Sequence, residues 1–212
     1  MKRTILFSLF AVLIFASTSV MAANTSRDSR IALKVDWLTF TDDLLEDTDS
    51  DETYYVAIDM RSPLTDYLDI GMEIGYVNFK GDITGPKPIS GKSGNFIGTW
   101  ENNIKFIPVE VNLSYSRHFG NLVYTLGAGV SGSFVNYEVD VNDTGTPFTL
   151  VDEESAWLKG AQAFFALGYD GDSYFFGVDG KYQALEEQEF FNQWLEVNFS
   201  NWRTGIHIGK RF

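Results

Sequence analysis

The last eleven residues, WRTGIHIGKRF (Trp202–Phe212), carry the pattern that decides the fold. Bulky or apolar side chains occupy every second position from Trp202 to Ile208, which is the period of a β-strand with one apolar face. The chain then ends on an aromatic residue, whereas the last residues of a soluble domain are usually polar and loosely held. We therefore expect a terminal strand that another part of the protein, or another molecule, must bury or bind.

Period two runs through almost the whole chain after residue 30. Seven further alternating segments precede the terminal one, at residues 31–38, 54–61, 68–76, 107–115, 122–131, 157–169 and 174–181. The segment Leu185–Glu196 comes nearest to a helical pattern but also fits a folded loop, so we expect no helix. Eight strands in succession without long crossovers predict an antiparallel meander.

The connections between these strands alternate strictly between short and long. Tight turns rich in Pro, Asp and Gly are expected at 63–67, 119–121 and 170–173, and long polar loops at 41–53, 81–103, 140–155 and 185–200. All long loops then leave from one end, as in bacterial outer-membrane barrels with short periplasmic turns and an even strand number. The predicted fold is an all-β, eight-stranded antiparallel up-and-down transmembrane β-barrel with both termini on the periplasmic side.

The first residues, MKRTILFSLFAVLIFASTSVMAAN, have the layout of a cleavable secretory signal peptide. Lys2 and Arg3 precede an apolar run, and small residues follow at Ala22 and Ala23. A membrane anchor helix is the alternative, but the run is short for a span of about 20 residues. We predict a signal peptide at 1–22 and an outer-membrane β-barrel domain at 23–212. The chain has no Cys, which excludes a lipoprotein anchor and disulfides.

The net charge argues against nucleic-acid binding, and the aromatic content is typical of a protein with aromatic belts. The whole chain has a formal charge of −13, and loss of the two signal-peptide cations leaves −15. Such a surface repels nucleic acid, and no basic stripe offsets it. The chain is dense in aromatics, with 18 Phe, 10 Tyr and 5 Trp, which supports the assignment of aromatic belts below.

Aromatic residues at the strand ends predict two girdles at the two membrane interfaces. The external girdle is Trp37, Tyr54, Tyr76, Phe134, Trp157, Tyr182 and Trp202, and the periplasmic one is Tyr115, Tyr124, Tyr169, Tyr174 and Phe212. Phe212 would close the barrel against the first strand. The opposite, inward face carries Lys34, Asp36, Asp59, Arg61, Asp69, Glu73, Glu110, Asp179, Lys181, Arg203 and Arg211. Alternation alone does not say which face is wet, so a soluble barrel of lipocalin type stays open as an alternative.

Two stretches carry a family resemblance. FIPVEVNLSYSRHFGNLVYTLGAGVSGSF (Phe106–Phe134) and the terminal WRTGIHIGKRF resemble the small outer-membrane β-barrel family, porin-like proteins related to eight-stranded adhesion and surface proteins of Gram-negative bacteria. The resemblance implies insertion by the barrel assembly machinery, which recognises a terminal aromatic, here Phe212. Lys210 departs from the pattern, because the family more often has an aromatic residue two positions before the end.

Two motifs suggest ligands and are set aside. GAGVSG (Gly127–Gly132) matches a dinucleotide-binding pattern, but another alternating stretch follows where that motif needs a helix. We expect Gly127 and Gly129 to face inward and leave room for long side chains across a narrow lumen. DTDSD (47–51) resembles the start of a calcium loop, but Glu52 and Ile58 stand where an EF-hand needs Gly and Glu. Loose divalent binding that bridges to lipopolysaccharide remains a weaker alternative.

The sequence gives little support for a catalytic function. The two histidines are His118 at a periplasmic turn and His207, inward in the last strand; Ser116 lies near His118 without an evident acid. We expect no catalytic, metal or cofactor site and no cofactor. The inward charges should form a plug of mutual ion pairs, since side chains can fill the interior of eight strands. Pro108 predicts a bulge or a late strand start near the external rim.

These expectations combine into one interpretation. The chain should be a monomeric, integral protein of the bacterial outer membrane, with a plugged polar interior and acidic extracellular loops in a structural or surface-interaction role. Its expected partners are outer-membrane lipids, lipopolysaccharide and the barrel assembly machinery. The alternatives are a narrow channel for small or apolar solutes and a lipid-modifying enzyme.

Overall fold

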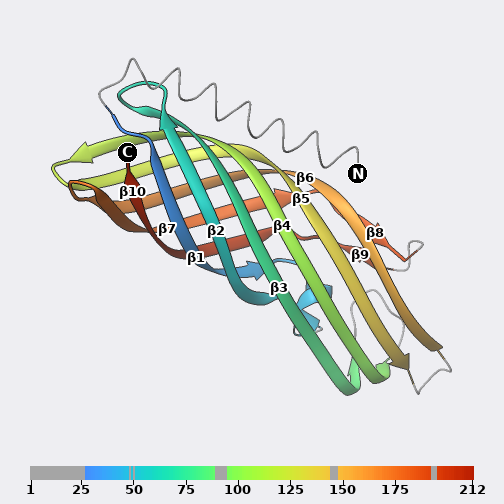
Figure 1. Ribbon diagram of the computed structural model, residues 1–212. Helices are drawn as coiled ribbons and strands as arrows, with labels where there is room; N and C mark the ends of the chain where they lie inside the picture. Colours follow the sequence, from blue (N-terminus) through green and yellow to red (C-terminus); the bar gives the residue numbers. More distant parts are fainter. Residues whose placement is uncertain (1–26, 48, 50, 89–94, 144–147, 192–194) are drawn as a thin grey trace.

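Eight strands close into a barrel in which each strand pairs with its neighbours in the chain, and the last pairs with the first (Figure 1). This computed structural model describes residues 27–47, 49, 51–88, 95–143, 148–191 and 195–212. The order around the barrel is β1-β10-β7-β6-β5-β4-β3-β2, and every pairing is antiparallel. The predicted eight-stranded meander is confirmed. The predicted signal peptide lies outside the described residues.

The barrel strands differ greatly in length. They are β1 (Arg30–Phe40), β2 (Glu52–Pro63), β3 (Leu68–Pro88), β4 (Asn95–Phe119), β5 (Leu122–Asp143), β6 (Phe148–Asp170), β7 (Tyr174–Leu185) and β10 (Asn201–Arg211). A helix, α2 (Asp43–Asp47), follows β1, and β8 (Gln188–Phe190) pairs with β9 (Leu195–Val197) between β7 and β10.

The tight turns and both ends of the barrel sequence lie at one end, which we name the turn end. The connections at 64–67, 120–121 and 171–173 are short, as predicted, and Gly120 adopts a φ of 62° that side chains disfavour. The N–H of Phe212 donates to the carbonyl of Ser29 at 3.0 Å, beyond the β1–β10 ladder. Phe212 therefore closes the barrel against the first strand, as expected. The opposite end is the loop end.

Four strands continue well past the closed barrel at the loop end. β2 pairs with β3 only as far as Tyr76, and β7 pairs with β6 only as far as Gly160. The remaining parts of β3 to β6 (77–88, 95–106, 135–143 and 148–159) form a four-stranded sheet, here called the extension (Figure 1). The predicted long loops at 81–103 and 140–155 are therefore wrong for residues 81–88, 95–103, 140–143 and 148–155, which are strand. Backbone hydrogen bonds between neighbouring strands hold the described residues in the sheet. Polar side chains on the outward face do not prevent this, because one face of an antiparallel sheet can be exposed to water.

Two smaller predictions also fail. The loop at 41–53 contains α2, which was missed because five residues are too few to show a helical period. The carboxylate of Asp42 caps it, accepting from the N–H of Leu44 at 2.9 Å, and also accepts from the N–H of Asn198 at 2.8 Å. Burial raises the pKa of the Asp42 carboxyl, and the backbone N–H donors oppose that shift. Residues 185–200 contain the β8–β9 pair, and the described residues of this segment form no helix.

Pro108 produces neither a bulge nor a late strand start. β4 begins thirteen positions earlier, at Asn95, and the β4–β5 register is constant through the Pro108–Ser133 pair. The β3–β4 pairing passes from Ile74–Val109 to Val77–Phe106 in the same register, without pairs between them. Because proline has no N–H to donate, the ladder is interrupted locally while its register is kept.

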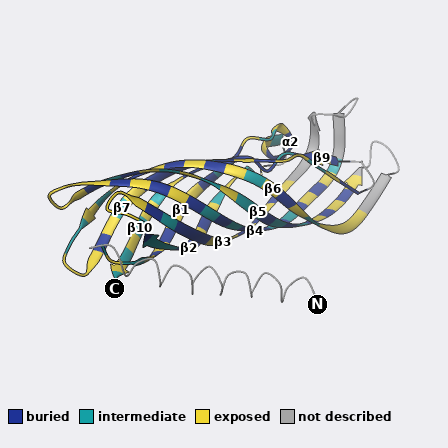
Figure 2. Ribbon diagram, turned by 90° about the horizontal axis from the view of Figure 1, so that it is seen from above, coloured by how far each residue is buried: buried dark blue, intermediate teal, exposed yellow. Residues whose placement is uncertain are grey.

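The burial pattern alternates along the strands in the closed part of the barrel (Figure 2). Leu113 is 52% exposed and its neighbour Asn112 only 4%, so the apolar face points outward and the polar face inward, as predicted. In the extension this polarity is reversed on β3, β4 and β5. On β4 the inward positions change from Glu110 to Phe106, and the outward positions change from Leu113 to Glu101. The reversal falls at one row of neighbouring outward residues, Tyr76, Ile107, Phe134 and Trp157.

Candidate functional site

The centre of the barrel is occupied by charged side chains that form ion pairs with one another. We call them the central charge layer: Lys34, Asp36, Glu73, Glu110, Asp179, Lys181 and Arg203, all at most 4% exposed. The Nζ of Lys34 lies 2.7 Å from Asp179, 3.2 Å from Glu73 and 3.5 Å from Asp36. One ammonium group thus holds three carboxylates from three different strands.

Glu73 is the second centre of this layer. Its carboxylate accepts from the hydroxyl of Tyr55 at 2.7 Å and pairs with Lys181 at 2.8 Å and Arg203 at 3.3 Å. Glu110 pairs with the same two cations, with Lys181 at 2.6 Å and also with Arg203. The Arg203 guanidinium lies over the Tyr55 ring, 4.5 Å from its centroid. Charge, hydrogen bonds and ring stacking together cross-link β2, β3, β4, β7 and β10.

A second group of ion pairs lies at the turn end. The pairs are Asp69 with Arg27 and Arg30 (2.9 and 3.2 Å), Asp59 with Arg61 (2.8 Å) and Asp170 with Arg211 (3.8 Å). Each of the eleven predicted inward charges therefore has an opposite charge within 4 Å. Arg27, Arg30 and Asp170 were missed, because they lie at or beyond the ends of the alternating segments.

Glycines on the inner wall make room for these large side chains. A Cβ on Gly127 would lie 2.2 Å from the Phe164 ring, and a Cβ on Gly129 would lie 2.4 Å from Oδ1 of Asn112. Both positions belong to β5, and strand continues after them rather than a helix. The structure thus confirms the space-making role of GAGVSG. Gly75 does the same for Tyr55, whose ring would be 2.1 Å from an added Cβ.

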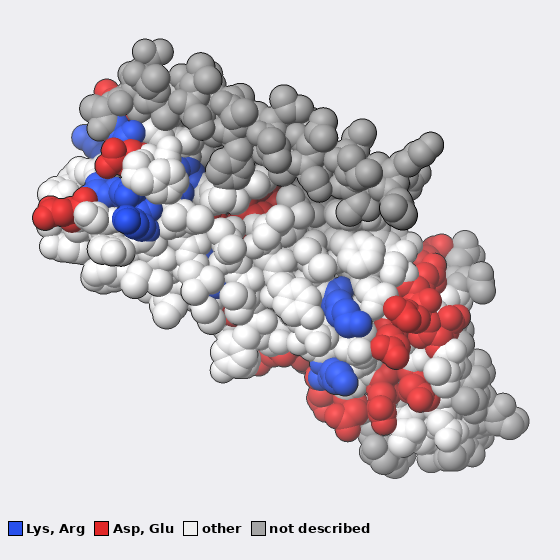
Figure 3. All heavy atoms as spheres, in the orientation of Figure 1, with Lys and Arg blue, Asp and Glu red and all other residues white. Residues whose placement is uncertain are grey.

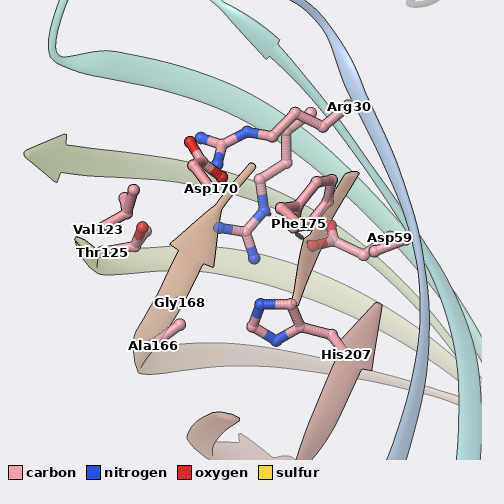
Figure 4. A pocket seen from close by; sticks show the side chains of 11 residues that line it. Arg30, Asp59, Val123, Thr125, Ala166, Gly168, Asp170, Phe175 and His207 are labelled. Atoms are coloured by element: carbon pink, nitrogen blue, oxygen red, sulfur yellow. Dashed lines mark hydrogen bonds and ion pairs between the residues drawn. The ribbon is translucent and has the colours of Figure 1, made fainter. Parts of the chain in front are cut away.

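A small cavity of about 30 Å³ remains between the two groups of charges (Figure 4). Arg30, Asp59, Thr125, Asp170 and His207 are among its lining residues. That volume is roughly enough for one water molecule. The Nδ1 of His207 lies 3.1 Å from Oδ1 of Asp179, so this histidine belongs to the paired interior, as expected.

The loop end of the interior is sealed by an apolar cluster, the apolar cap. Its buried members are Leu38, Phe40, Leu44, Leu45, Tyr55, Ala57, Val77, Phe79, Trp100, Ile104, Phe106, Val135, Tyr137, Val139, Val141, Leu158, Leu185, Phe190, Phe191, Leu195, Val197 and Phe199. They come from the extension, from α2, from the β8–β9 pair and its flanking residues, and from the barrel strands β1, β2 and β7. On β1, Leu38 directly follows the charged position Asp36 on the inward face, so the cap lies next to the charge layer.

One buried polar group lies inside the cap. Oδ1 of Asn102 accepts from Nε1 of Trp100 at 2.7 Å and from the hydroxyl of Tyr137 at 3.0 Å. Burial raises the pKa of the Tyr137 hydroxyl, which keeps it protonated and able to donate. Sequence reasoning missed the cap, although alternation continues through Phe134–Val139. The alternation of apolar and polar residues was visible in the sequence, but in this part of the chain the apolar residues occupy the inward positions instead of the outward ones.

The outer face of the extension is acidic (Figure 3). Asp82, Glu101 and Asp140 are exposed and stand directly opposite one another on β3, β4 and β5. Glu138 and Glu153 form another opposed pair on β5 and β6. Like charges in such positions repel, which lowers sheet stability but keeps the face hydrated.

The remaining predicted candidates do not assemble into a site. His118 lies 3.6 Å from Asp170 at the turn end. Of the acidic run at 47–51, Asp47 ends α2 and Asp49 has a φ of 51°. No group of three or more potential metal ligands occurs within the ranges that the structure covers. Nor does any helix in those ranges have the length and apolarity to cross a membrane.

Comparison with known proteins identifies the fold. No protein-family model and no curated sequence matches the chain. Among solved structures, the outer membrane protein OprG of Pseudomonas aeruginosa aligns over 88% of this chain and 96% of its own, with a TM-score of 0.57 and 14% identity. Neisserial surface protein A aligns over 87% and 97%, with a TM-score of 0.53 and 9% identity.

A third similar structure is Ail, the attachment invasion locus protein of Yersinia pestis, which aligns over 88% of this chain and 99% of its own. Its TM-score is 0.50 and its identity 9%. These likenesses confirm the barrel fold that the sequence resemblance implied, that of the small eight-stranded outer-membrane proteins.

Proposed function

We propose that this protein is an integral barrel of the bacterial outer membrane, with a plugged interior and an acidic extension that faces the cell exterior. The observation that carries the proposal is the reversal of polarity at a single level of the wall. Below that level the outward face is apolar, and above it the outward face is polar and the inward face forms the apolar cap. A change of solvent at that level, from lipid to water, accounts for the reversal.

The dimensions of the apolar band support a membrane-spanning role. On β4 the outward apolar positions run from Ile107 to Tyr115, which fits the roughly 9–11 residues that a tilted strand needs to cross a bilayer. Leu126 and Val130 are 56% and 64% exposed. A soluble protein would have to keep this continuous apolar belt in water, far beyond the patches that monomers usually expose.

The interior supports a closed barrel rather than a channel. Seven buried charges from five strands pair across the lumen, and the apolar cap covers the loop end. A solute would have to separate buried ion pairs and then cross an apolar layer, and both steps are costly. We propose a structural or surface-interaction role for a monomer in contact with outer-membrane lipids, and assembly through recognition of Phe212.

An enzymatic role has weaker support. The histidine beside the central charge layer, His207, has its Nδ1 at Asp179 and its Nε2 beside Gly177 and Gly168. A nucleophile would be needed near that second nitrogen, and glycines stand there. We therefore propose that the protein is not an enzyme.

Three measurements test the proposal. The purified protein should shift its electrophoretic mobility on heating in detergent and should fractionate with outer membranes. Reconstituted in planar bilayers, it should show no stable unitary currents. Regular conductance steps would refute the plugged interior and favour the narrow channel, and a protein that stayed soluble without detergent would refute the membrane assignment.

A further inference from the structure

We propose that Asp36 is a proton-binding site of the central charge layer, and that its ionisation unbalances the interior where the barrel closes. The layer holds three permanent cations against four carboxylates, which are Asp36, Glu73, Glu110 and Asp179. Its formal charge with all four ionised is therefore −1, in side chains that are at most 4% exposed. A net charge at that depth is costly, and uptake of a proton removes the cost.

Asp36 is the least compensated of the four carboxylates. Both of its oxygens are buried, and neither has a hydrogen-bond partner among the described residues. The other three carboxylates of the layer each take part in at least one hydrogen bond with a lysine or histidine side chain. The Nζ of Lys34 lies 3.5 Å from Asp36, farther than from Asp179 and Glu73, at 2.7 and 3.2 Å. A buried carboxylate without donors is the member of the layer that gains most from being neutral.

The space around Asp36 suits a proton rather than a larger cation. Its Oδ1 lies against Gly205, its cross-strand partner on β10, where an added Cβ would be 2.2 Å from that oxygen. The small cavity that His207 lines (Figure 4) does not extend to Asp36. A proton needs no additional volume, so Asp36 can accept this positive charge without displacing a neighbour.

The groups around Asp36 come from five strands. Its partner on β2 is Tyr55, and on β10 Arg203 and His207 lie two residues to either side of Gly205. The titratable and charged groups that face it are Lys34 on β1, Tyr55 on β2, Glu73 on β3, Asp179 on β7, and Arg203 and His207 on β10.

His207 is the rival carrier of this proton, because its Nδ1 lies 3.1 Å from Oδ1 of Asp179. A proton on His207 would strengthen a contact of Asp179, which already has Lys34 at 2.7 Å. It would leave both oxygens of Asp36 without a donor. A proton on Asp36 instead removes the least compensated charge of the layer, so we place it there.

The site lies at the seam where the last strand, β10, pairs with the first, β1. While Asp36 carries its proton, the layer is balanced; once Asp36 ionises, a fourth negative charge faces the backbone of Gly205 across the seam. In an unfolded chain an aspartate loses its proton near about pH 4. If the folded barrel holds the proton more tightly, the folded state binds more protons than the unfolded one. Stability must then fall as the pH rises.

The test compares urea unfolding of wild type and Asp36→Asn, both refolded into lipid vesicles, from about pH 5 to about pH 9. Asparagine keeps the shape of the side chain but cannot ionise. The unfolding constant of wild type, divided by that of Asp36→Asn, should rise at least about tenfold over this range, which corresponds to a tenfold tighter hold on the proton. The matched control is Asp82→Asn on the exposed face of the extension, for which the same ratio should stay constant within about twofold. The infrared spectrum of wild type at about pH 6 should also show the C=O stretch of a protonated carboxylic acid, which Asp36→Asn should lack.

Three results would overturn the inference. They are a constant ratio for Asp36→Asn, an equal rise for Asp82→Asn, and a rise that disappears when both proteins also carry His207→Gln, which would move the proton to the histidine. If Asp36→Asn does not refold, the spectrum of wild type decides, and the absence of the acid band refutes the site. The heat-dependent mobility shift is recorded for every variant. Its absence in wild type would contradict the proposed outer-membrane function, whereas a constant ratio would contradict only the proton site.

Discussion

Replacing Glu73 by Gln tests whether the central charge layer holds the barrel together. The carboxylate receives one hydroxyl and three cationic groups, from Tyr55, Lys34, Lys181 and Arg203. Glutamine keeps the shape and one acceptor oxygen but removes the charge, in a residue that is 1% exposed. Removing one partner of a buried ion pair costs about 3–5 kcal/mol, because the other charge is left uncompensated.

The surrounding groups place the expected loss at the lower end of that range. Lys34 keeps Asp36 and Asp179, while Lys181 and Arg203 still share Glu110. We therefore expect Glu73→Gln to lower the free energy of unfolding by about 3 kcal/mol. The assay is urea unfolding of protein refolded into lipid vesicles, followed by tryptophan fluorescence and the heat-dependent mobility shift.

Glu101→Gln is the matched control, since it makes the same chemical change on the exposed face of the extension. It removes like-charge repulsion from Asp82 and Asp140, so stability should stay the same or rise by roughly 0.2–1 kcal/mol. A loss below about 1 kcal/mol in Glu73→Gln would refute the idea that the paired interior is a major source of stability.

Four other substitutions test the membrane band, the terminus and the cap of α2. Leu126→Arg should cost about 2–4 kcal/mol of stability in vesicles if Leu126 lies near the bilayer midplane, whereas Gly127→Arg should fail by crowding against Phe164 whatever the lipid; equal lipid sensitivity of the two would contradict the assigned faces. Phe212→Ala should reduce the amount of folded, heat-modifiable barrel in outer membranes without affecting export across the inner membrane, and wild-type amounts would speak against recognition of the terminal aromatic. Asp42→Ala should cost about 1 kcal/mol in urea unfolding, since it removes the helix cap, and no change would show that α2 does not need it.

The sequence by itself determined the barrel. Period two in eight segments, three tight turns and the aromatic strand ends were sufficient for strand number, topology and the direction of each face. Parity placed Leu113 and Asn112 on opposite faces, and the aromatic girdles on the apolar face indicated that Leu113 points outward, as the structure shows. The inward charges could also be named in advance, since they occupy alternate positions opposite the apolar set.

Only the tertiary structure decided which charges meet and where the sheet ends. That Lys34 on β1 pairs with Asp179 on β7 depends on the curvature of the closed barrel, which brings strands together that are not neighbours in the ladder. The extension was hidden for a different reason. Its apolar residues, such as Ile104 and Val139, lie inward, so its outward face reads as a polar loop. The strand period is the same in both parts, but the apolar face follows the solvent, and only the three-dimensional arrangement shows where lipid is replaced by a protein core.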